Sequence, residues 1–190
     1  MFKPTIFVKW FLFFVMPLSL SMIDIRFFAI VMGFLITEIW RTMSHFFGGE
    51  WVPTPDFIVD KMLKTSGVKR NDVLYDLGSG DGKIILKAAK SAGKTIGIEI
   101  DPLRVLISRI RIKLSNLNNV KVIQDNFYKI NVRNADVVTL FLLPKTMERI
   151  ENKLRKELRK GARIVSYRFV FKNWKPIKID ETNKIYLYKV

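Results

Sequence analysis

The sequence predicts an α/β protein: a doubly wound, mostly parallel sheet preceded by an apolar helical membrane anchor. Short apolar runs alternate with helical patterns between residues 54 and 169, which is typical of parallel strands joined by crossover helices. Two further apolar runs flank Asp180-Glu181-Thr182-Asn183 and predict an antiparallel C-terminal hairpin. Residues 4–37 contain only three charged side chains. We therefore expect an anchor in residues 1–46 and one globular domain in residues 47–190.

Composition restricts the chemistry that the domain can perform. The chain has 190 residues and a formal net charge of +16, from 33 Lys and Arg against 17 Asp and Glu. It has no cysteine, which excludes disulfides, zinc–thiolate sites, iron–sulfur clusters and cysteine nucleophiles. The single histidine, His45, argues against a Ser-His-Asp triad and a multi-histidine metal site. We expect no metal, and chemistry that depends on a bound organic cofactor.

The apolar start of the chain has three interpretations. A cleaved signal peptide explains Lys3 and Lys9 but leaves residues 27–40 unexplained, and a soluble helical hairpin exposes too many aromatic side chains. We favour a membrane anchor formed by a two-helix hairpin that turns near Asp24-Ile25-Arg26. A single tilted span with an interfacial second helix is the close rival. The hairpin places the basic domain on the side that the positive-inside rule predicts to be cytoplasmic.

Capping signals place the helices of the domain. Thr54-Pro55 predicts an N-cap followed by proline at the first helical position, and Gly67 ends that helix. Asp101-Pro102 opens another helix in the same way, and this helix runs to about Leu114. The other predicted helices are 83–92, which ends at Gly93, and the highly charged 147–158, which Gly161 ends. The predicted strands are the short apolar runs 73–75, 95–98, 120–123, 137–142, 164–169, 177–179 and 185–188.

Glycine and acidic residues follow the strands of this sheet. Ligands of doubly wound sheets bind beyond the carboxyl ends of the strands. A glycine-rich turn, Gly78-Ser79-Gly80-Asp81-Gly82, follows the first predicted strand. Five acids gather at this edge of an otherwise basic domain: Asp76, Asp81, Glu99, Asp101 and Asp125. The acidic edge favours a cationic ligand.

The turn and the acids together favour S-adenosyl-L-methionine over a dinucleotide. Lys83 stands where the nicotinamide fingerprint has its third glycine, and an acidic edge repels a pyrophosphate. We expect Glu99 to accept both ribose hydroxyls and Asp125 to accept from the adenine amino group. The alternative is structural: Glu99 ends a strand, Asp101 caps a helix and Asp125 forms a turn. The other expected cofactor contacts are Asp76, Gly78, Ser79, Gly80, Asp81, Gly82, Ile100, Asn126 and Phe127.

Two groups of motifs resemble a known family. Residues 73–83 with Gly97-Ile98-Glu99-Ile100-Asp101 are similar to motif I and the following acidic loop of class I methyltransferases, whose sheet is Rossmann-like and seven-stranded. A second set resembles the protein-lysine methyltransferases that include the archaeal broad-specificity enzyme and the mitochondrial enzyme that acts on the ATP synthase c-ring protein. This set is Trp51-Val52-Pro53-Thr54-Pro55, Gly161-Ala162-Arg163-Ile164-Val165-Ser166-Tyr167 and Trp174-Lys175-Pro176. The resemblance covers about residues 51–190, and the mitochondrial members also carry an apolar segment before the catalytic domain.

The resemblance implies methylation of lysine ε-amines. Phe141-Leu142-Leu143-Pro144 replaces the motif of base-amino methyltransferases after the fourth strand, which argues against adenine or cytosine N-methylation. Free lysine has a pKa of about 10.4, and a desolvating aromatic slot beside a sulfonium lowers it. Trp51, Tyr128 and Phe141 are the candidates for this slot, with core packing as the alternative. The sequence identifies no dedicated base.

A basic segment lies between residues 145 and 163. It is either a solvated helix face or a surface attracted to anionic lipid headgroups. Nucleic acid is not an expected partner, because the aromatic interleaving of single-strand binders is absent. The eight cations are Lys145, Arg149, Lys153, Arg155, Lys156, Arg159, Lys160 and Arg163.

The expected function is therefore that of a membrane-anchored, cytoplasm-facing methyltransferase for membrane-proximal protein lysines. Its rivals are a methyltransferase for a lipid, quinone or RNA, and a membrane protein that binds the cofactor without catalysis.

Overall fold

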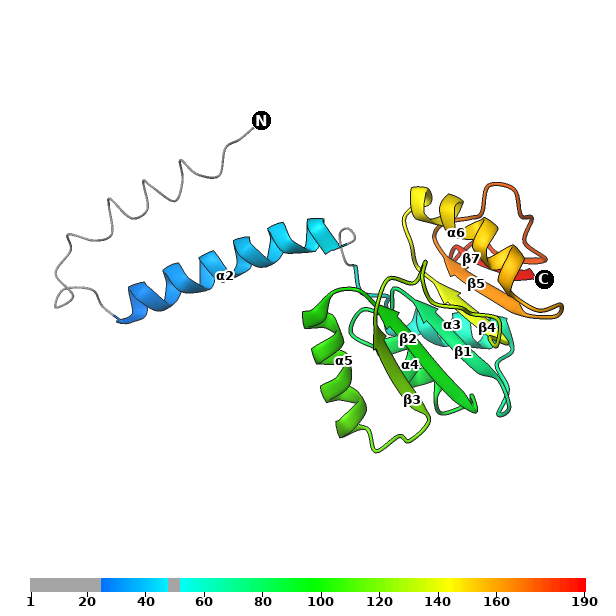
Figure 1. Cartoon of the computed structure of the whole chain (residues 1–190), viewed down its shortest axis with the longest axis horizontal. Helices are drawn as coiled ribbons and strands as arrows, with labels where there is room; N and C mark the ends of the chain where they lie inside the picture. The colour runs from blue at the N-terminus through cyan, green and yellow to red at the C-terminus, as the bar shows by residue number, and fades with distance from the viewer. Residues whose placement is uncertain (1–24, 48–51) are drawn as a thin grey trace. The chain divides into compact units, whose positions relative to one another are not determined.

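The computed structural model describes residues 25–47 and 52–190 of the chain. The chain divides into two compact units, with the boundary between Phe46 and Phe47. Helix α2 (Ile25–Phe47) has 23 residues and, except for its last residue, belongs to the first unit. The second unit contains the helices α3 (Asp56–Ser66), α4 (Lys83–Ala88), α5 (Pro102–Leu114) and α6 (Pro144–Glu157) and all seven strands of the sheet (Figure 1).

The seven strands form one sheet in the order β3-β2-β1-β4-β5-β7-β6. Strands β1 to β5 pair in parallel, while β7 pairs antiparallel with both β5 and β6. The predicted doubly wound sheet and its C-terminal antiparallel hairpin are therefore confirmed. The strands are β1 (Val73–Leu77), β2 (Lys94–Glu99), β3 (Val120–Gln124), β4 (Val137–Leu140), β5 (Arg163–Tyr167), β6 (Lys178–Asp180) and β7 (Ile185–Lys189).

Helices cover both faces of the sheet because the strands are apolar on both sides. Successive side chains of a strand point to opposite faces, so Leu74 packs with α4 and α5 while Tyr75 belongs to the core beneath α6. Helix α6 buries Met147, Ile150 and Leu154, a spacing of three and four residues that forms one helical stripe. Helix α3 covers the other end of the α4–α5 face, through contacts with β5 and β7.

Several predicted boundaries are wrong, each for a local reason. Thr54 is not an N-cap: α3 begins at Asp56, and the carbonyl of Pro55 accepts the first helical hydrogen bonds, from Ile58 and Val59. Helix α4 ends at Ala88, four residues early, because the following residues continue as turns. Asp101 does cap α5, since its carboxylate accepts from the amides of Leu103 and Arg104.

The expected anchor falls mostly outside the described residues. Helix α2 begins at Ile25, so the proposed turn at residues 24–26 coincides with its start, and the first predicted apolar run lies before it. Within residues 25–47 and 52–190, no helix combines the length and the apolar character needed to cross a bilayer.

Candidate active site

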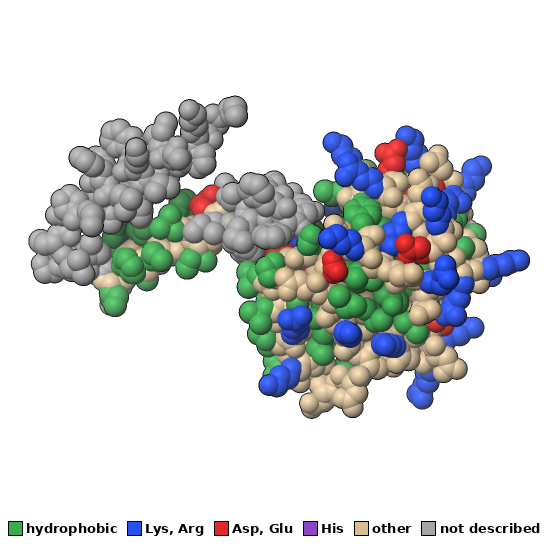
Figure 2. Space-filling view, viewed as in Figure 1, with side chains coloured by type: hydrophobic (Ala, Val, Ile, Leu, Met, Phe, Trp, Pro, Cys, Tyr) green, Lys and Arg blue, Asp and Glu red, His purple; other side chains and the backbone are tan. Residues whose placement is uncertain are grey.

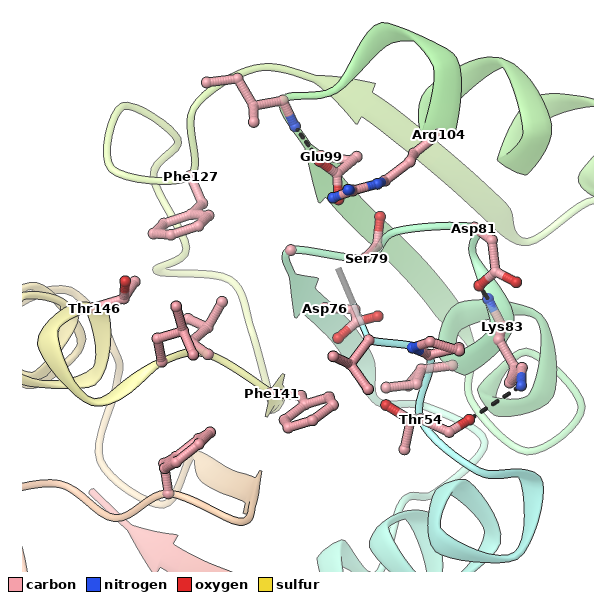
Figure 3. A pocket seen from close by; sticks show the side chains of 18 of the residues that line it. Thr54, Asp76, Ser79, Asp81, Lys83, Glu99, Arg104, Phe127, Phe141 and Thr146 are labelled. Carbon is pink, nitrogen blue, oxygen red and sulfur yellow. Dashed lines mark hydrogen bonds between the residues drawn. The ribbon is translucent and has the colours of Figure 1, made fainter. Parts of the chain in front are cut away.

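A cavity of about 440 Å³ opens at the carboxyl ends of the parallel strands, where ligands of doubly wound sheets bind. Residues from the ends of β1 to β5, from the first turns of α4, α5 and α6, and from the segment before α3 line it (Figure 3). Ten of the residues predicted as site residues line this one cavity: Asp76, Gly78, Ser79, Asp81, Glu99, Ile100, Asn126, Phe127, Tyr128 and Phe141.

The other four predicted site residues are not among the residues that line the cavity. Gly80 and Gly82 lie in the glycine loop but do not line the cavity. Asp125 also does not line it, and its carboxylate accepts a hydrogen bond from the amide of Asn126 at 2.6 Å. This bond fits the turn-forming alternative, but it uses only one carboxylate oxygen, so the contact of Asp125 with the adenine stays a prediction. Trp51 lies outside the described residues.

The glycine loop is held against β2 by close packing. The amides of Gly78 and Ser79 both donate to the carbonyl of Ile98, at 2.9 and 3.1 Å. A side chain at Gly97 would place its Cβ 2.5 Å from the hydroxyl of Ser79, so only glycine lets the loop approach this closely. That hydroxyl is buried and has no hydrogen-bond partner within the described residues, although Ser79 lines the cavity. Because the oxygen is buried beside Gly97, it can bond a ligand in the cavity only after the side chain turns toward it.

The carboxylate of Glu99 organises the loop from the end of β2. Its Oε2 accepts from the amide of Gly80 at 2.8 Å, and its Oε1 accepts from the amides of Ile100 and Asp101, both at 2.9 Å. Glu99 is only 5% exposed, so these bonds lie in a weakly solvated setting where they count for more. Because each carboxylate oxygen accepts about two hydrogen bonds, Oε2 keeps room for one more donor.

Asp76 is a buried carboxyl at the end of β1. It is 2% exposed, and its Oδ1 accepts a hydrogen bond from the hydroxyl of Thr139 at 2.6 Å. Burial raises the pKa of Asp76 to about 7, against the lowering effect of the Thr139 hydroxyl and with smaller raising effects from Glu99 and Asp81. The carboxyl is therefore poised to ionise when a cation arrives, because a nearby positive charge favours the charged form.

The segment before α3 forms one wall of the cavity. Val52, Pro53 and Thr54 line it, and the ammonium group of Lys83 donates to the carbonyl of Thr54 at 3.0 Å (Figure 3). Lys83 is the first residue of α4, so the bond joins this segment to the helix that follows the glycine loop.

Aromatic and arginine side chains line the other end of the cavity. The ring of Phe141 packs against Tyr167, with centroids 4.7 Å apart, and stacks on Phe169 at 6.4 Å. Phe127 and Tyr128 form a second aromatic pair at 4.7 Å. Burial raises the pKa of Tyr128, while the charge of Arg149 lowers it by a smaller amount. This end is therefore apolar with cations nearby, in contrast to the acidic end at the glycine loop.

Several lining residues were not predicted as site residues. Lys83 stood out in the sequence only as a departure from the nicotinamide fingerprint, and Arg149 only as part of the basic segment. Thr54 stood out only as a helix cap and as part of the Trp51–Pro55 motif. The remaining residues carry no local signal, because separate segments of the chain bring them to the cavity. The missed residues include Thr54, Lys83, Arg104, Thr146, Arg149, Arg168 and Phe169.

Four of the eight cations in the basic segment form ion pairs with acidic residues of the same domain. Lys153 pairs with Glu157 at 2.5 Å and Arg155 with the buried Glu151 at 3.2 Å, while the Arg155 guanidinium lies over the ring of Trp174. Arg159 and Arg163 pair with Asp136 and Asp72. On the face of the second unit that Figure 2 shows, Lys and Arg side chains are spread out rather than gathered in one patch. These contacts favour the solvated-face interpretation, with structural ion pairs added to it.

The cavity fits a cationic nucleoside. Two buried carboxyls, those of Asp76 and Glu99, meet the glycine loop at one end of it, where Gly78 and Ser79 line the wall. In the sheet that carries this site, β7 runs antiparallel to its neighbour β5. The site and the sheet together define a class I methyltransferase that uses S-adenosyl-L-methionine.

Comparison with known proteins places the chain more narrowly. Residues 76–178 match the family described as the ANTKMT methyltransferase domain, and the chain belongs to this family. It is 37% identical over 149 residues to a protein-lysine N-methyltransferase of Saccharolobus islandicus, an alignment that covers 74% of this chain and 92% of the relative. It is 32% identical over 121 residues to the adenine nucleotide translocase lysine N-methyltransferase of Mus musculus, covering 62% of this chain and 53% of that protein.

A solved structure supports the cofactor. A protein from Salinibacter ruber, described as an RNA methyltransferase in complex with S-adenosyl-L-homocysteine, is 37% identical. It superposes with a TM-score of 0.71 over 73% of this chain and 94% of its own. S-Adenosyl-L-homocysteine is the demethylated form of the cofactor that the acidic edge predicted, so that prediction is confirmed.

Proposed function

We propose that this protein methylates the ε-amine of lysine side chains in a protein substrate. The observation that carries the proposal is the single cavity that joins an acidic, glycine-lined end to an aromatic end. Family relatives named as lysine methyltransferases, from an archaeon and from animals, support the same substrate.

The acidic end holds the cofactor in this proposal. Asp76 faces the α-ammonium group, and its pKa near 7 falls when that cation binds. Ser79 turns its buried hydroxyl toward the cofactor, and Phe127, from the aromatic pair with Tyr128, lies against the adenine where the cofactor extends toward the other end. Glu99 receives one ribose hydroxyl on Oε2, rather than the two expected from the sequence, because Oε1 already accepts two backbone amides.

The aromatic end receives the lysine. When bound, S-adenosyl-L-methionine supplies an electrophilic methyl group on a sulfonium. Phe141 and Tyr128 exclude water from the entering side chain, and the loss of solvation disfavours the ammonium form of the lysine. The rigid packing of Phe141 on Tyr167 and Phe169 fixes the direction of approach, and alignment of amine and methyl supplies much of the rate.

Transfer of a labelled methyl group tests this function. The purified protein and tritiated cofactor are incubated with membrane and soluble extracts, and the products are divided by protease, nuclease and solvent extraction. The proposal predicts label in protease-sensitive material that hydrolyses to methyl-lysine. Label in nuclease-sensitive RNA, the substrate class named for the Salinibacter relative, or in extractable lipid or quinone overturns it. So does cofactor binding without any transfer.

We also propose that residues 1–46 hold the enzyme at a membrane, with the catalytic unit on the cytoplasmic face. Exposed apolar side chains along α2, among them Phe27, Phe28, Ile30, Phe34 and Ile36, support an apolar contact for this helix. Deletion of residues 1–45 should release the catalytic unit with its cofactor affinity intact. Recovery of the full chain in the aqueous fraction after a carbonate wash would contradict the attachment.

A further inference from the structure

Two basic residues beside the cavity hold an uncommon backbone conformation. Arg168 directly follows β5 with φ +67°, and Lys184 directly precedes β7 with φ +54°. The amide of Arg168 donates to the carbonyl of Lys184 at 2.8 Å, so the two strained residues are joined. Asn116 is the other non-glycine residue with positive φ in the described chain, and asparagine adopts this conformation far more often than arginine or lysine does. Strain of this kind collects at functional sites.

Both cations are free to receive an anion. Neither Arg168 nor Lys184 makes a side-chain hydrogen bond or ion pair with any described residue. Two acids lie in the turn before Lys184. Asp180 accepts three hydrogen bonds from Asn183, whose side-chain oxygen in turn accepts from Lys61. Glu181 contacts Lys184 through the backbone, where the amide of Lys184 donates to the Glu181 carbonyl at 3.3 Å. Arg149, across the aromatic end of the cavity, is also exposed and adds to the positive potential there.

Arg168 connects the cavity to a second hollow. This hollow has a volume of about 360 Å³ and is lined by Phe57, Ile58, Tyr167, Arg168, Thr182, Asn183 and Lys184. Phe57 is 59% exposed, so the hollow offers an apolar surface next to two cations. Arg168 lines both the cavity and the hollow. A substrate polypeptide that inserts one side chain into the cavity can therefore continue along the hollow on the protein surface.

We propose that Arg168 and Lys184, with the hollow between α3 and the β6–β7 turn, bind the substrate polypeptide next to its target lysine and select an acidic residue there. The inference rests on the proposed lysine methylation and names the substrate class of the same site. A carboxylate of the substrate pairs with the two cations, and an apolar neighbour contacts Phe57. Charge complementarity favours this occupant, since a basic flanking sequence would be repelled.

The carboxylate that Arg168 binds has a second possible source, the methionine end of the cofactor. The two sources give different measurements. If Arg168 binds the substrate, its loss raises KM for peptides with an acidic flank and leaves cofactor affinity nearly unchanged. If it binds the cofactor, its loss weakens cofactor binding and acts equally on every peptide.

The test uses the full-length protein and two series of peptides with one lysine each, with Asp or Asn placed at each position within four residues of it. The double variant Arg168→Asn and Lys184→Asn removes both charges with a residue that accepts positive φ. Lys160→Asn is the control, an exposed turn lysine outside both cavities. Initial rates, methyl-lysine content and cofactor Kd by calorimetry are measured for each protein.

The wild type and the control should favour the best Asp peptide over its Asn partner at least tenfold in kcat/KM, and the double variant less than threefold. Equal rates on the two wild-type series overturn this inference but leave lysine methylation standing. A cofactor Kd that rises tenfold in the double variant, with the Asp preference kept, also overturns it. Absence of methyl-lysine in every peptide overturns the proposed function and this inference together.

Discussion

The ammonium group of Lys83 donates a hydrogen bond to the carbonyl oxygen of Thr54 at 3.0 Å (Figure 3). The bond spans 29 positions of the chain and ties the wall of the cavity before α3 to the first residue of α4. Thr54 is only 8% exposed, and the side chain of Lys83 is 22% exposed, so water competes weakly for the bond. Lys83 therefore positions the wall that closes the cofactor end of the cavity.

Replacing Lys83 tests this positioning role. Lys83→Met keeps the aliphatic stem but removes the bond, and we expect cofactor affinity to fall about tenfold, the loss of one charge-assisted hydrogen bond. Lys87→Met is the matched control, because Lys87 ties α4 to Asp60 and does not line the cavity. Calorimetric titration with S-adenosyl-L-homocysteine measures both. Equal affinities for the two variants would show that Lys83 is only a structural tether.

Cofactor affinity should depend on pH through Asp76. Its pKa is raised from 3.8 to about 7 in the free protein, so the carboxyl is largely protonated at pH 6 and ionised at pH 8. A cationic ligand binds the ionised form, so affinity should rise about tenfold from pH 6 to pH 8. Asp76→Asn should bind weakly at both pH values. A wild-type Kd that does not change across this range would separate Asp76 from the bound cation.

The same raised pKa has a consequence for stability. A carboxyl whose pKa is higher in the folded state stabilises the fold when protonated, and this contribution is lost as pH rises from about 4 through 7. The free wild-type protein should therefore lose stability over that range by more than Asp76→Asn does. Denaturant unfolding at several pH values measures the difference, and parallel curves for the two proteins would argue against an elevated pKa.

Arg163 should be required for stability rather than for activity. Its guanidinium donates to the carbonyls of Ser66 and Gly67 at 2.7 and 2.5 Å and pairs with Asp72 at 2.6 Å, joining the end of α3 to β5. Arg163→Met leaves the buried Asp72 with the amide of Lys69 but without its cationic partner, which should lower the free energy of unfolding by about 3 kcal/mol. Adding Asp72→Asn should restore part of the loss. An additive double variant would show that the two residues do not interact.

Glu99 should serve both the loop and the cofactor. The carboxylate of Glu99 accepts hydrogen bonds from three backbone amides. In Glu99→Gln, the side-chain NH2 group replaces one of the two accepting oxygens, so at least one backbone amide loses its acceptor. We expect about 1–3 kcal/mol less stability and at least tenfold weaker cofactor binding. Thermal unfolding with and without S-adenosyl-L-homocysteine reports both effects. Unchanged stability with weak binding would assign Glu99 to the ligand alone.

The sheet and the acidic end of the site were predictable because local signals mark them. Apolar runs located all seven strands, and Asp101-Pro102 located the start of α5. The glycine loop and the acids at the ends of β1 and β2 are recognisable from short stretches of sequence. Asp76, Ser79 and Glu99 were therefore predictable without knowledge of their tertiary contacts. They lie in one cavity because parallel strands end at one edge.

The rest of the site was not predictable, because tertiary contacts decide it. Thr54 looked like a helix cap, but α3 begins two residues later, and Lys83, far along the chain, holds the Thr54 carbonyl. Asp125 accepts a hydrogen bond from the amide of Asn126, a local contact that the sequence pattern did not specify, and its contact with the adenine stays a prediction. Arg168 and Lys184 have no sequence signal, since their significance comes from a backbone conformation that arginine and lysine rarely adopt.

The most direct test of the central claim is mass spectrometry of lysine in proteins methylated by the purified chain. The full-length protein and Glu99→Gln are incubated with S-adenosyl-L-methionine and with membranes from cells that lack the protein. We expect the wild type to add methyl groups to lysine ε-amines, and Glu99→Gln to add at least tenfold fewer. The methylated lysines should lie mainly in sequences with an acidic residue nearby. Methyl groups found in RNA or lipid, with protein lysine unmodified, would contradict lysine methylation as the function of this protein.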